Sequence, residues 1–495
     1  MTDLRDFVRG CTFDDFLFTP QYSVLERRDP AAIDLSCRLS ERLTLKRPIV
    51  SANMDTVTRA EMAIAVAEEG GIGIIDRGFR SGDIEPQIRE VERVKRRQHG
   101  IIADPYTISP AATLGEAAEM MRRTGVGSLV VVDDQRKVAG LLTNRDIRFV
   151  PDAGTLVSAR MTPREQLIGS EGPLDAAAAE ELMRVHKIKK LPIIGRDGTL
   201  GGLITARDLI KQRQLPFATR DDHGRLRVGA AIGAKGDYLE RAAQLLRAGA
   251  DVIVIDIAHG HSAVMSRAIE AFRKQFGDVE LIAGNVATAE GVRFLLDRGV
   301  NGIKVGIGPG GGCTTRLNTN FGVPQVEALV ACRHEAGGRV PLIADGGVKR
   351  DGAIVQALLF GGDTVMLGSM FAGTLETPGD TVQKPVVIPE SHKTVKVSFK
   401  VFRGMASLQA IVDRLDVEDA ESADVEALGA EGMEISVPAR GSVRPLIRNM
   451  LKHLCSAISY GGAKSLSELQ DTFRRDPDRL VIRLTGSSRR ESFDR

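Results

Sequence analysis

A glycine-rich stretch that ends in a cysteine, VGIGPGGGCTTR at residues 305–316, is the part of the sequence best suited to chemistry. The backbone N–H groups of such a loop can surround a phosphate. A thiol at Cys313 would then lie beside whatever group carries that phosphate, and Thr315 follows two residues later. Free cysteines are more often small buried hydrophobic residues, so the loop is what marks Cys313 as a candidate nucleophile. The same setting is missing around Cys11, Cys37, Cys332 and Cys455.

Eight short apolar segments, rich in β-branched residues and ending in small or polar ones, predict the elements that position this loop. Helical stretches such as residues 237–250 and 290–299 lie between most of them. Apolar strands that alternate with amphipathic helices indicate a parallel sheet covered on both faces, and eight strands are the number for a (β/α)8 barrel. A doubly wound open sheet is the competing fold, but no GxGxxG turn follows the first segment. The eight segments begin at Arg47, Gly71, Leu226, Asp251, Val279, Gly302, Val340 and Asp363.

In a (β/α)8 barrel the loops after the carboxyl ends of the strands form the active site. The polar residues that follow the eight segments are therefore expected to meet at one end of the barrel, with the cysteine loop after the sixth. The residues at these ends are Asn53, Asp55, Asp256, His259, Asn285, the loop 308–313, Asp345, Gly346, Gly347, Gly368 and Ser369.

The composition predicts a cytoplasmic enzyme rather than a binder of nucleic acid or membranes. Lys and Arg number 67 against 65 Asp and Glu, so no overall field attracts polyanions. No apolar run is long enough to span a bilayer, and the start MTDLRDFVRG lacks the pattern of a secretory signal. Five scattered cysteines without a CxxC pair indicate neither a disulfide framework nor a zinc site.

An insertion at residues 100–218 interrupts the barrel pattern, which occupies residues 1–99 and 219–495. A chain of 495 residues is too long for one ordinary core, and a second domain is expected on length alone. The insertion contains an internal repeat, at about 104–149 and 158–214. Each copy is expected to form a turn, a helix, two short strands and a closing Thr-x-Arg-Asp.

This repeat resembles a pair of CBS modules. The resemblance implies a regulatory site for ATP or GTP in which the threonine and aspartate of each Thr-x-Arg-Asp meet the ribose. The alternative is that these residues only cap the last helix of each copy. The four residues are Thr143, Asp146, Thr205 and Asp208.

Over essentially its whole length the chain resembles the IMP dehydrogenase/GMP reductase family. The motifs are specific together, although no single one would be. The resemblance implies a homotetramer, with octamers through CBS pairing. The matching stretches are FDDFLFTP, ANMDTVT, IDIAHGHS, AGNVAT, GIGPGxxCTTR, GVPQ, ADGGV, MLGSMFAGTLETPGD, FRGMASLQA and EGMEISVPARG.

The family's chemistry implies a role for the cysteine loop. A thiolate at Cys313 adds to C2 of a purine nucleotide, hydride moves between C2 and a nicotinamide, and a covalent thioimidate results. Thr315 is implied near the leaving or entering group at C2. A phosphate anchored in the same loop would hold C2 in register with the thiol.

The resemblance also implies the residues that bind the substrate. Backbone groups and small side chains would hold the phosphate, while Asp345 takes the ribose hydroxyls and Asn285 hydrogen-bonds the substrate. Met54 is expected on the ribose or base, and the stretch FRGMAS is expected to close over the nucleotide with the Met405 amide. The substrate-binding candidates are Met54, Asn285, Gly310, Gly311, Asp345, Gly346, Gly347, Gly368, Ser369, Gly404, Met405 and Glu431.

A nicotinamide cofactor and a potassium ion are implied in the same region. Asp256 is the expected contact of the nicotinamide ribose, with Asn53, Gly306 and Gly308 as further cofactor-binding candidates. Backbone carbonyls of Gly308, Gly310 and Cys313 match those that hold potassium in related dehydrogenases.

Two reactions fit this skeleton. A dehydrogenase oxidises IMP to XMP with NAD and then hydrolyses the thioimidate, for which the family uses an Arg-Tyr pair on a flap, here at about 374–440. A reductase converts GMP to IMP and ammonia with NADPH. Only Arg414 remains of the pair, since Leu415 follows it, and Thr315 with Glu376 could transfer protons in either reaction. A third class is a nucleotide-binding paralogue without turnover, against which the intact Cys313 argues.

Other features divide between the two reactions. Asn53 in ANMD resembles the reductases, whereas AHGHS, FGVPQ and RGMASLQA resemble the dehydrogenases, in which the insertion is also commoner. Gly311 and Gly312 replace a serine and an apolar residue, and Phe402 replaces a tyrosine. We expect the dehydrogenase, with the reductase as the alternative.

Overall fold

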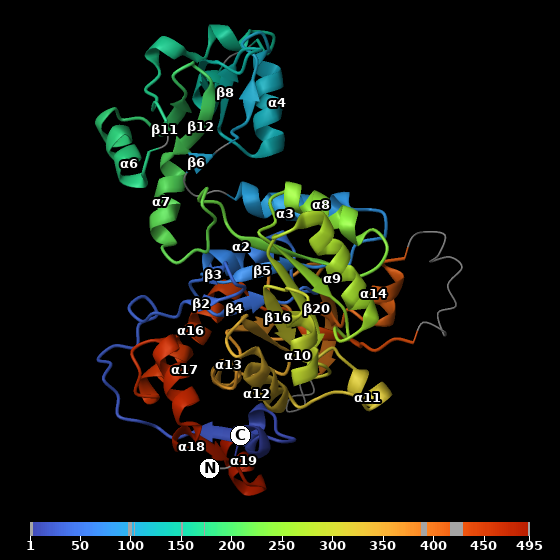
Figure 1. Ribbon diagram of the computed structural model, residues 1–495. Helices are drawn as coiled ribbons and strands as arrows, with labels where there is room; N and C mark the ends of the chain where they lie inside the picture. The colour runs from blue at the N-terminus through green and yellow to red at the C-terminus, as the bar shows by residue number, and fades with distance from the viewer. Residues whose placement is uncertain are drawn as a thin grey trace. The chain divides into compact units, whose positions relative to one another are not determined.

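In the computed structural model, eight parallel strands close into a barrel (Figure 1). The structure describes residues 3–97, 101–102, 104–149, 152–172, 174–387, 394–415 and 429–493. The order of the strands is β13-β14-β15-β16-β17-β18-β4-β5, so β5 returns to β13 and the open sheet is excluded. The predicted (β/α)8 barrel is confirmed, and each predicted segment supplies one strand. The strands are β4 (Ile49–Ser51), β5 (Ile72–Ile75), β13 (Val228–Ile232), β14 (Val252–Asp256), β15 (Leu281–Val286), β16 (Gly302–Val305), β17 (Leu342–Asp345) and β18 (Thr364–Leu367).

Most helices around the barrel bury one apolar face, whereas α2 and α13 are buried along nearly their whole length. In α9 the buried residues Met265, Ala268, Ile269 and Phe272 follow the spacing i, i+3, i+4, i+7 of one helical face, and Ser262 caps its first turn. The barrel helices are α2 (Ala60–Glu68), α3 (Glu85–Arg96), α8 (Tyr238–Arg247), α9 (Ala263–Phe276), α10 (Ala289–Leu296), α12 (Gln325–Ala336), α13 (Asp351–Leu359), α16 (Val443–Tyr460) and α17 (Leu466–Arg475).

The interior of the barrel is filled by apolar side chains from almost every strand, among them Val50, Ile74, Val254 and Ile343. Lys304 of β16 is the exception, with only 2% of its surface exposed. A buried cation in such a place requires anionic partners.

The two ends of the chain meet in a small antiparallel pair of β1 (Phe16–Phe18) with β22 (Val481–Arg483), and Figure 1 draws both termini there. Phe16 and Phe18 both pack against the ring of Phe360, which directly follows α13. Further short elements are α1 (Leu4–Phe7), β2 (Cys37–Arg38), β3 (Thr44–Leu45), α11 (Thr315–Thr319), α18 (Pro477–Leu480) and α19 (Gly486–Phe493).

The region predicted as a flap forms a three-stranded antiparallel sheet with one short helix. The sheet has the order β19-β20-β21, with β19 at Val382–Val387, β20 at Thr394–Arg403 and β21 at Glu434–Pro438. Helix α14 (Leu408–Val412) follows β20 directly. Residues 388–393 and 416–428 of the predicted flap lie outside the described part of the chain.

The chain divides into two compact units, and the smaller one comprises Arg97–Pro216 with Arg220–Arg225. In it two copies of a helix–strand–strand–helix unit follow one another, in sheets ordered β10-β9-β8-β7 and β11-β12-β6. Val130 and Leu141 of the first copy share a core with Ile194 and Leu203 of the second. The copies consist of α4 (Leu114–Thr124), β8 (Ser128–Val132), β9 (Val138–Thr143) and α5 (Asn144–Ile147), then α6 (Ala176–Val185), β11 (Lys190–Ile194), β12 (Leu200–Thr205) and α7 (Ala206–Gln214), with β6 (Ile101–Ile102), β7 (Thr107–Ile108) and β10 (Thr162–Pro163) beside them.

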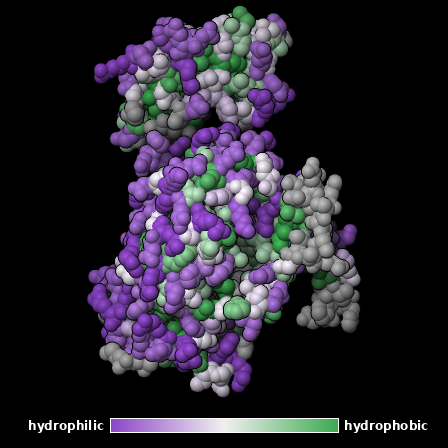
Figure 2. All heavy atoms as spheres, turned by 45° about the vertical axis from the view of Figure 1, so that its right-hand side comes forward, coloured by the Kyte–Doolittle hydropathy of each residue, from purple (hydrophilic) through white to green (hydrophobic). Residues whose placement is uncertain are grey.

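The face drawn in Figure 2 is largely hydrophilic, with hydrophobic side chains in scattered groups. Within the described part of the chain, no helix is both long and apolar enough to span a bilayer.

Candidate active site

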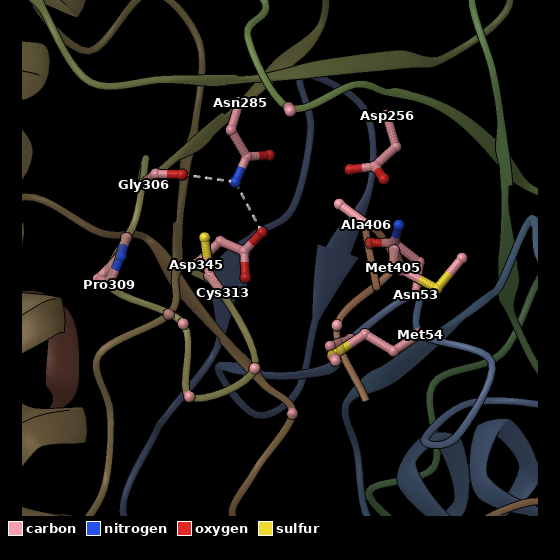
Figure 3. Close-up of a pocket in the computed structure, with 18 of the residues that line it drawn as sticks. Asn53, Met54, Asp256, Asn285, Gly306, Pro309, Cys313, Asp345, Met405 and Ala406 are labelled. Atoms are coloured by element: carbon pink, nitrogen blue, oxygen red, sulfur yellow. Dashed lines mark hydrogen bonds between the residues drawn. The ribbon is translucent and has the colours of Figure 1, made fainter. Parts of the chain in front are cut away.

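A cavity of about 310 Å³ lies at the carboxyl ends of the barrel strands, where the loops converge. Figure 3 shows side chains entering it from opposite walls, with Asn285 and Asp345 on one side and Asp256 and Met54 on another. The predicted site residues that line this cavity are Asn53, Met54, Asp256, Asn285, Gly306, Gly308, Gly310, Gly311, Cys313, Thr315, Asp345, Gly346, Gly347, Gly368, Ser369, Gly404, Met405, Arg414 and Glu431.

The cysteine loop is held in place by the flap. Met433 N–H donates to the Gly312 carbonyl at 3.0 Å, and Thr314 N–H donates to the Glu431 carbonyl at 2.9 Å. A Cβ atom at Gly312 would lie 2.8 Å from the Gly404 nitrogen, so any larger residue there would push the two backbones apart. This close approach explains why Gly312 departs from the apolar residue expected before the cysteine.

Gly311 has no comparable constraint. A Cβ atom there would meet the Ser369 side chain at 3.5 Å, which is an ordinary contact. The structure gives no packing reason for the absence of a serine at this position. Phe402, the other departure, is 2% exposed and lines the cavity beside Ser369.

A hydrogen-bonded chain leads away from the candidate nucleophile. The Cys313 thiol donates to Thr315 Oγ1 at 3.2 Å, and the Thr315 hydroxyl donates to Glu431 Oε2 at 2.7 Å. A proton leaving the thiol therefore has a direct route through the hydroxyl to a carboxylate. We expected Glu431 among the substrate contacts; the structure places it as the hydrogen-bond partner of Thr315.

Glu376, which we expected to transfer protons with Thr315, lies elsewhere. Its carboxylate accepts hydrogen bonds from Val443 N–H at 2.8 Å and from the Ser442 hydroxyl, and it pairs with Arg444 at 3.2 Å. It does not line the cavity. The structure does not bring Glu376 to Thr315, because its carboxylate holds the amino end of α16, where a helix favours an anion.

A buried charge network lies beneath the cavity. Lys304 pairs with Asp256 at 2.6 Å and with Asp345 at 2.9 Å, and Asn285 Nδ2 donates to Asp345 at 2.9 Å and to the Gly306 carbonyl at 2.8 Å. Burial alone would raise the pKa of Asp256, but the neighbouring cations of Lys304 and Arg77 lower it. The same two carboxylates raise the pKa of Lys304 despite its burial.

Sequence reasoning missed Lys304 and Arg77, although both line the cavity. The signal for Lys304 was a lone lysine inside the apolar strand GIKVG, which a barrel must bury and neutralise. Arg77 follows β5 directly and approaches Asp256 at 3.6 Å, so it stands at a strand end like the predicted residues.

Arg414 enters the cavity from the end of α14. Its Nη1 donates to the Met405 carbonyl at 2.7 Å. Burial lowers the pKa of Arg414 to about 10, and the Arg77 cation acts in the same direction, against the carboxylates of Asp55 and Asp256. Near neutral pH a larger fraction of Arg414 is thus neutral than for an ordinary arginine.

In the smaller unit the predicted nucleotide residues hydrogen-bond to one another within each copy. Thr143 donates through both its N–H and its hydroxyl to Asp146 Oδ2, each at 2.7 Å, and caps α5. Thr205 and Asp208 make the equivalent side-chain contact at α7. This is the capping geometry that we considered as the alternative, and a nucleotide contact at these residues stays a prediction.

The fold and the cavity together define a barrel enzyme whose candidate nucleophile, Cys313, lies on a strand-end glycine loop. A model of the IMP dehydrogenase / GMP reductase domain matches residues 10–494. The chain belongs to this family.

Similar proteins carry both names of the family. The inosine-5'-monophosphate dehydrogenase of Aquifex aeolicus is 42% identical over 486 residues, which cover 98% of this chain and 94% of that protein. The enzyme of the same name from Halalkalibacterium halodurans is 42% identical over 488 residues, covering 98% and 95%. Among solved structures, a GMP reductase variant from Trypanosoma brucei in complex with guanosine 5'-monophosphate matches with a TM-score of 0.86 and 38% identity over 99% of both chains. The same reductase in complex with guanosine 5'-triphosphate matches with a TM-score of 0.76 and 36% identity, over 96% and 98%.

Proposed function

We propose that this protein oxidises IMP to XMP with NAD, through a thioimidate on Cys313. The observation that carries the proposal is Arg414, a half-buried guanidinium in the same cavity as Cys313 with its pKa lowered to about 10. A dehydrogenase needs a base to activate the water that hydrolyses its intermediate, whereas a reductase does not. The dehydrogenase relatives at 42% identity support the same direction.

In the first half of this reaction Cys313 makes a bond to C2 of IMP. The thiol proton passes to Thr315 and Glu431, along the hydrogen bonds of 3.2 and 2.7 Å. NAD supplies the acceptor for the hydride that leaves C2. The product of this half is the thioimidate, in which sulfur occupies the position that hydrogen has left.

In the second half Arg414 takes a proton from a water molecule, which adds to C2, and the carbon–sulfur bond breaks to give XMP. Sulfur leaves as the thiolate. Over the whole cycle IMP, NAD and water become XMP, NADH and a proton. Arg414 can accept that proton only while neutral, which its lowered pKa favours.

The cavity offers free polar atoms for the nucleotide and the cofactor. Asn285 Oδ1 is buried, and within the described chain no hydrogen-bond partner is found for it. Asp345 is proposed to accept hydrogen bonds from the ribose hydroxyls of the nucleotide. Asp256 is proposed to do the same for the nicotinamide ribose, since it keeps lone pairs beyond those used by Lys304. The phosphate would lie against Gly310, Gly311, Gly346, Gly347, Gly368 and Ser369. The base and ribose would contact Met54, Gly404 and Met405. The cofactor would contact Asn53, Gly306 and Gly308.

Potassium is proposed at the carbonyls of Gly308, Gly310 and Cys313. The Gly310 carbonyl already accepts the Cys313 N–H at 3.1 Å, which leaves it a second lone pair for a cation. Replacing potassium by sodium in the assay tests this: unchanged turnover would contradict it.

Two assays in parallel test the reaction. One contains IMP and NAD, the other GMP and NADPH, and both are followed at the nicotinamide absorbance. We expect NADH to form in the first and NADPH to persist in the second. Robust GMP-dependent oxidation of NADPH without IMP-dependent NADH would instead establish the reductase.

The reductase is the second candidate because of the Cys313–Thr315–Glu431 chain. Ammonia that leaves C2 must be protonated, and a hydroxyl backed by a carboxylate can supply that proton. The similar Trypanosoma brucei structures are reductases, which favours this candidate as well. A large loss of GMP-dependent activity on Glu431→Gln, with Arg414→Ala unaffected, would support it.

The insertion at 100–218 is proposed as a CBS pair that binds ATP or GTP. Its two helix–strand–strand–helix copies support this, and so does the similarity to a reductase crystallised with guanosine 5'-triphosphate. We further propose a cytoplasmic homotetramer that forms octamers through these pairs, which light scattering with and without GTP would detect.

Removing residues 104–216 and joining the ends should leave a folded and active barrel. The smaller unit has its own core, and its two connections enter and leave between consecutive barrel strands β5 and β13. Asp146→Ala and Asp208→Ala in the full chain should change the effect of ATP or GTP without changing turnover at saturating substrate. A soluble, oligomeric deletion variant without activity would contradict an autonomous regulatory unit.

A further inference from the structure

Arg403, at the end of β20, connects the barrel to the helix that carries Arg414. Its Nε and Nη2 donate to Asp55 Oδ2 at 3.0 and 2.6 Å, and Nη2 also donates to Asp413 Oδ2 at 2.7 Å. Asp55 lies in the loop after β4, and Asp413 directly follows the last residue of α14, Val412. The three side chains form one chain of charges, which we call the latch: Asp55, Arg403 and Asp413.

Most of the latch is buried. The side chain of Asp55 is 3% exposed and that of Arg403 is 13% exposed, while Asp413 at 41% faces solvent on one side. Charge-assisted hydrogen bonds are strong in such surroundings. Burial alone would raise the pKa of Asp413, but its hydrogen bonds from Gln409 and Arg403 lower it.

The latch affects Arg414 because Asp413 is the residue directly before it in the chain. The Arg414 carbonyl accepts a hydrogen bond from Ser81 N–H at 3.0 Å, and its guanidinium is fixed on the Met405 carbonyl. The loop that holds Ser81 is itself anchored, since Arg241 of α8 donates to the Arg80 carbonyl at 3.0 Å. Arg414 is thus held by one contact to a barrel loop, at Ser81, and by one within the flap, at Met405.

We propose that Arg403 is a positioning residue, whose ion pairs with Asp55 and Asp413 hold α14 on the barrel and keep Arg414 in the cavity. Arg403 does not line the cavity, whereas Arg414 does. Any effect of Arg403 on the reaction would therefore be exerted through the position of Arg414. The effect expected on hydrolysis rests on the proposed dehydrogenase function. The effect expected on the mobility of α14 does not.

Asp413→Asn tests the latch, because it removes the charge at the most exposed member and keeps the side chain's size. Amide hydrogen exchange over residues 408–415 is expected to become about tenfold faster as α14 opens locally more often. In rapid-mixing assays with IMP and NAD, the burst of NADH should keep its rate. Steady-state turnover should fall by roughly 10- to 100-fold, the loss that a misplaced catalytic group causes.

Two further variants separate positioning from general damage. Glu434→Gln is the matched control, since Glu434 of β21 also faces Arg403, at 3.9 Å, but has no connection to Arg414. It should change neither exchange nor turnover. Asp413→Glu keeps the charge and should restore turnover at least in part. On an Arg414→Ala background, Asp413→Asn should cause no further loss.

The outcomes distinguish the latch from the proposed function. Unchanged exchange in Asp413→Asn, or an equal change in Glu434→Gln, would overturn the latch whatever the reaction is. Faster exchange with unchanged steady-state turnover would overturn its role in positioning Arg414. Faster exchange in a protein that oxidises NADPH with GMP and makes no NADH from IMP would support the latch and overturn the dehydrogenase.

Discussion

Cys313→Ser abolishes turnover but leaves nucleotide binding intact. A serine hydroxyl stays protonated near neutral pH and cannot attack C2, so we expect a loss of about a million-fold, as when an enzyme loses its nucleophile. The residues proposed to contact the substrate's phosphate and ribose are other ones, so IMP should still bind, which calorimetry would measure. The hydroxyl can also keep the hydrogen bond that the thiol makes to Thr315, so the loop should keep its conformation.

Labelling provides the control for this prediction. An electrophilic purine nucleotide should modify Cys313, because burial raises the pKa of each of the other four thiols and keeps them protonated. Modification of Cys332 or Cys455 with Cys313 untouched would contradict the assignment.

Arg414→Ala slows hydrolysis of the thioimidate while hydride transfer continues. A burst of one NADH per active site should then precede a steady state slower by roughly 10²- to 10⁴-fold, the contribution of a positioned acid or base. Rapid-mixing absorbance measurements separate the two phases. A control variant, Arg96→Ala, removes an exposed arginine that does not line the cavity and, within the described chain, pairs only with Glu92 on its own helix, and it should behave as the wild type.

The pH dependence provides a second readout. The neutral form of Arg414 is the one that accepts a proton, and below its pKa of about 10 the neutral fraction grows as pH rises. Steady-state turnover limited by hydrolysis should therefore increase with pH toward 10 in the wild type, and the increase should be lost in Arg414→Ala. A burst-free variant with full turnover would exclude Arg414 as the base.

The two candidate reactions differ at this point of the molecule. The hydride step proposed for either reaction uses Cys313 and the nicotinamide, so the barrel alone is compatible with both. Glu431 and Arg414 both come from the flap, and both reach the cavity. If loss of Arg414 limits turnover, the reaction is hydrolysis; if loss of Glu431 does, it is release of ammonia. The variants Arg414→Ala and Glu431→Gln measure this directly.

The sequence alone determined the barrel and the gathering of its loops. Each strand is a short apolar segment with a polar end, and parallel strands in a closed sheet bring their carboxyl ends to one side. Asn285, Asp345 and Cys313 could therefore be placed together, although 28 positions separate Asn285 from Cys313. The glycine-rich loop identified the candidate nucleophile, because few other settings bring a phosphate close to a backbone.

Only the tertiary structure decided how the flap works on that loop. Glu376 and Glu431 are both acidic residues of the predicted flap, and local pattern does not distinguish them. Glu431 reaches Thr315 because the backbones of Gly312 and Gly404 touch, and Glu376 is drawn instead to Arg444 and the end of α16. Arg403 likewise meets Asp55 across 348 positions of sequence. Such pairings depend on which distant segments pack together. The hydrophobic periodicity of one segment does not predict which other segment it will contact.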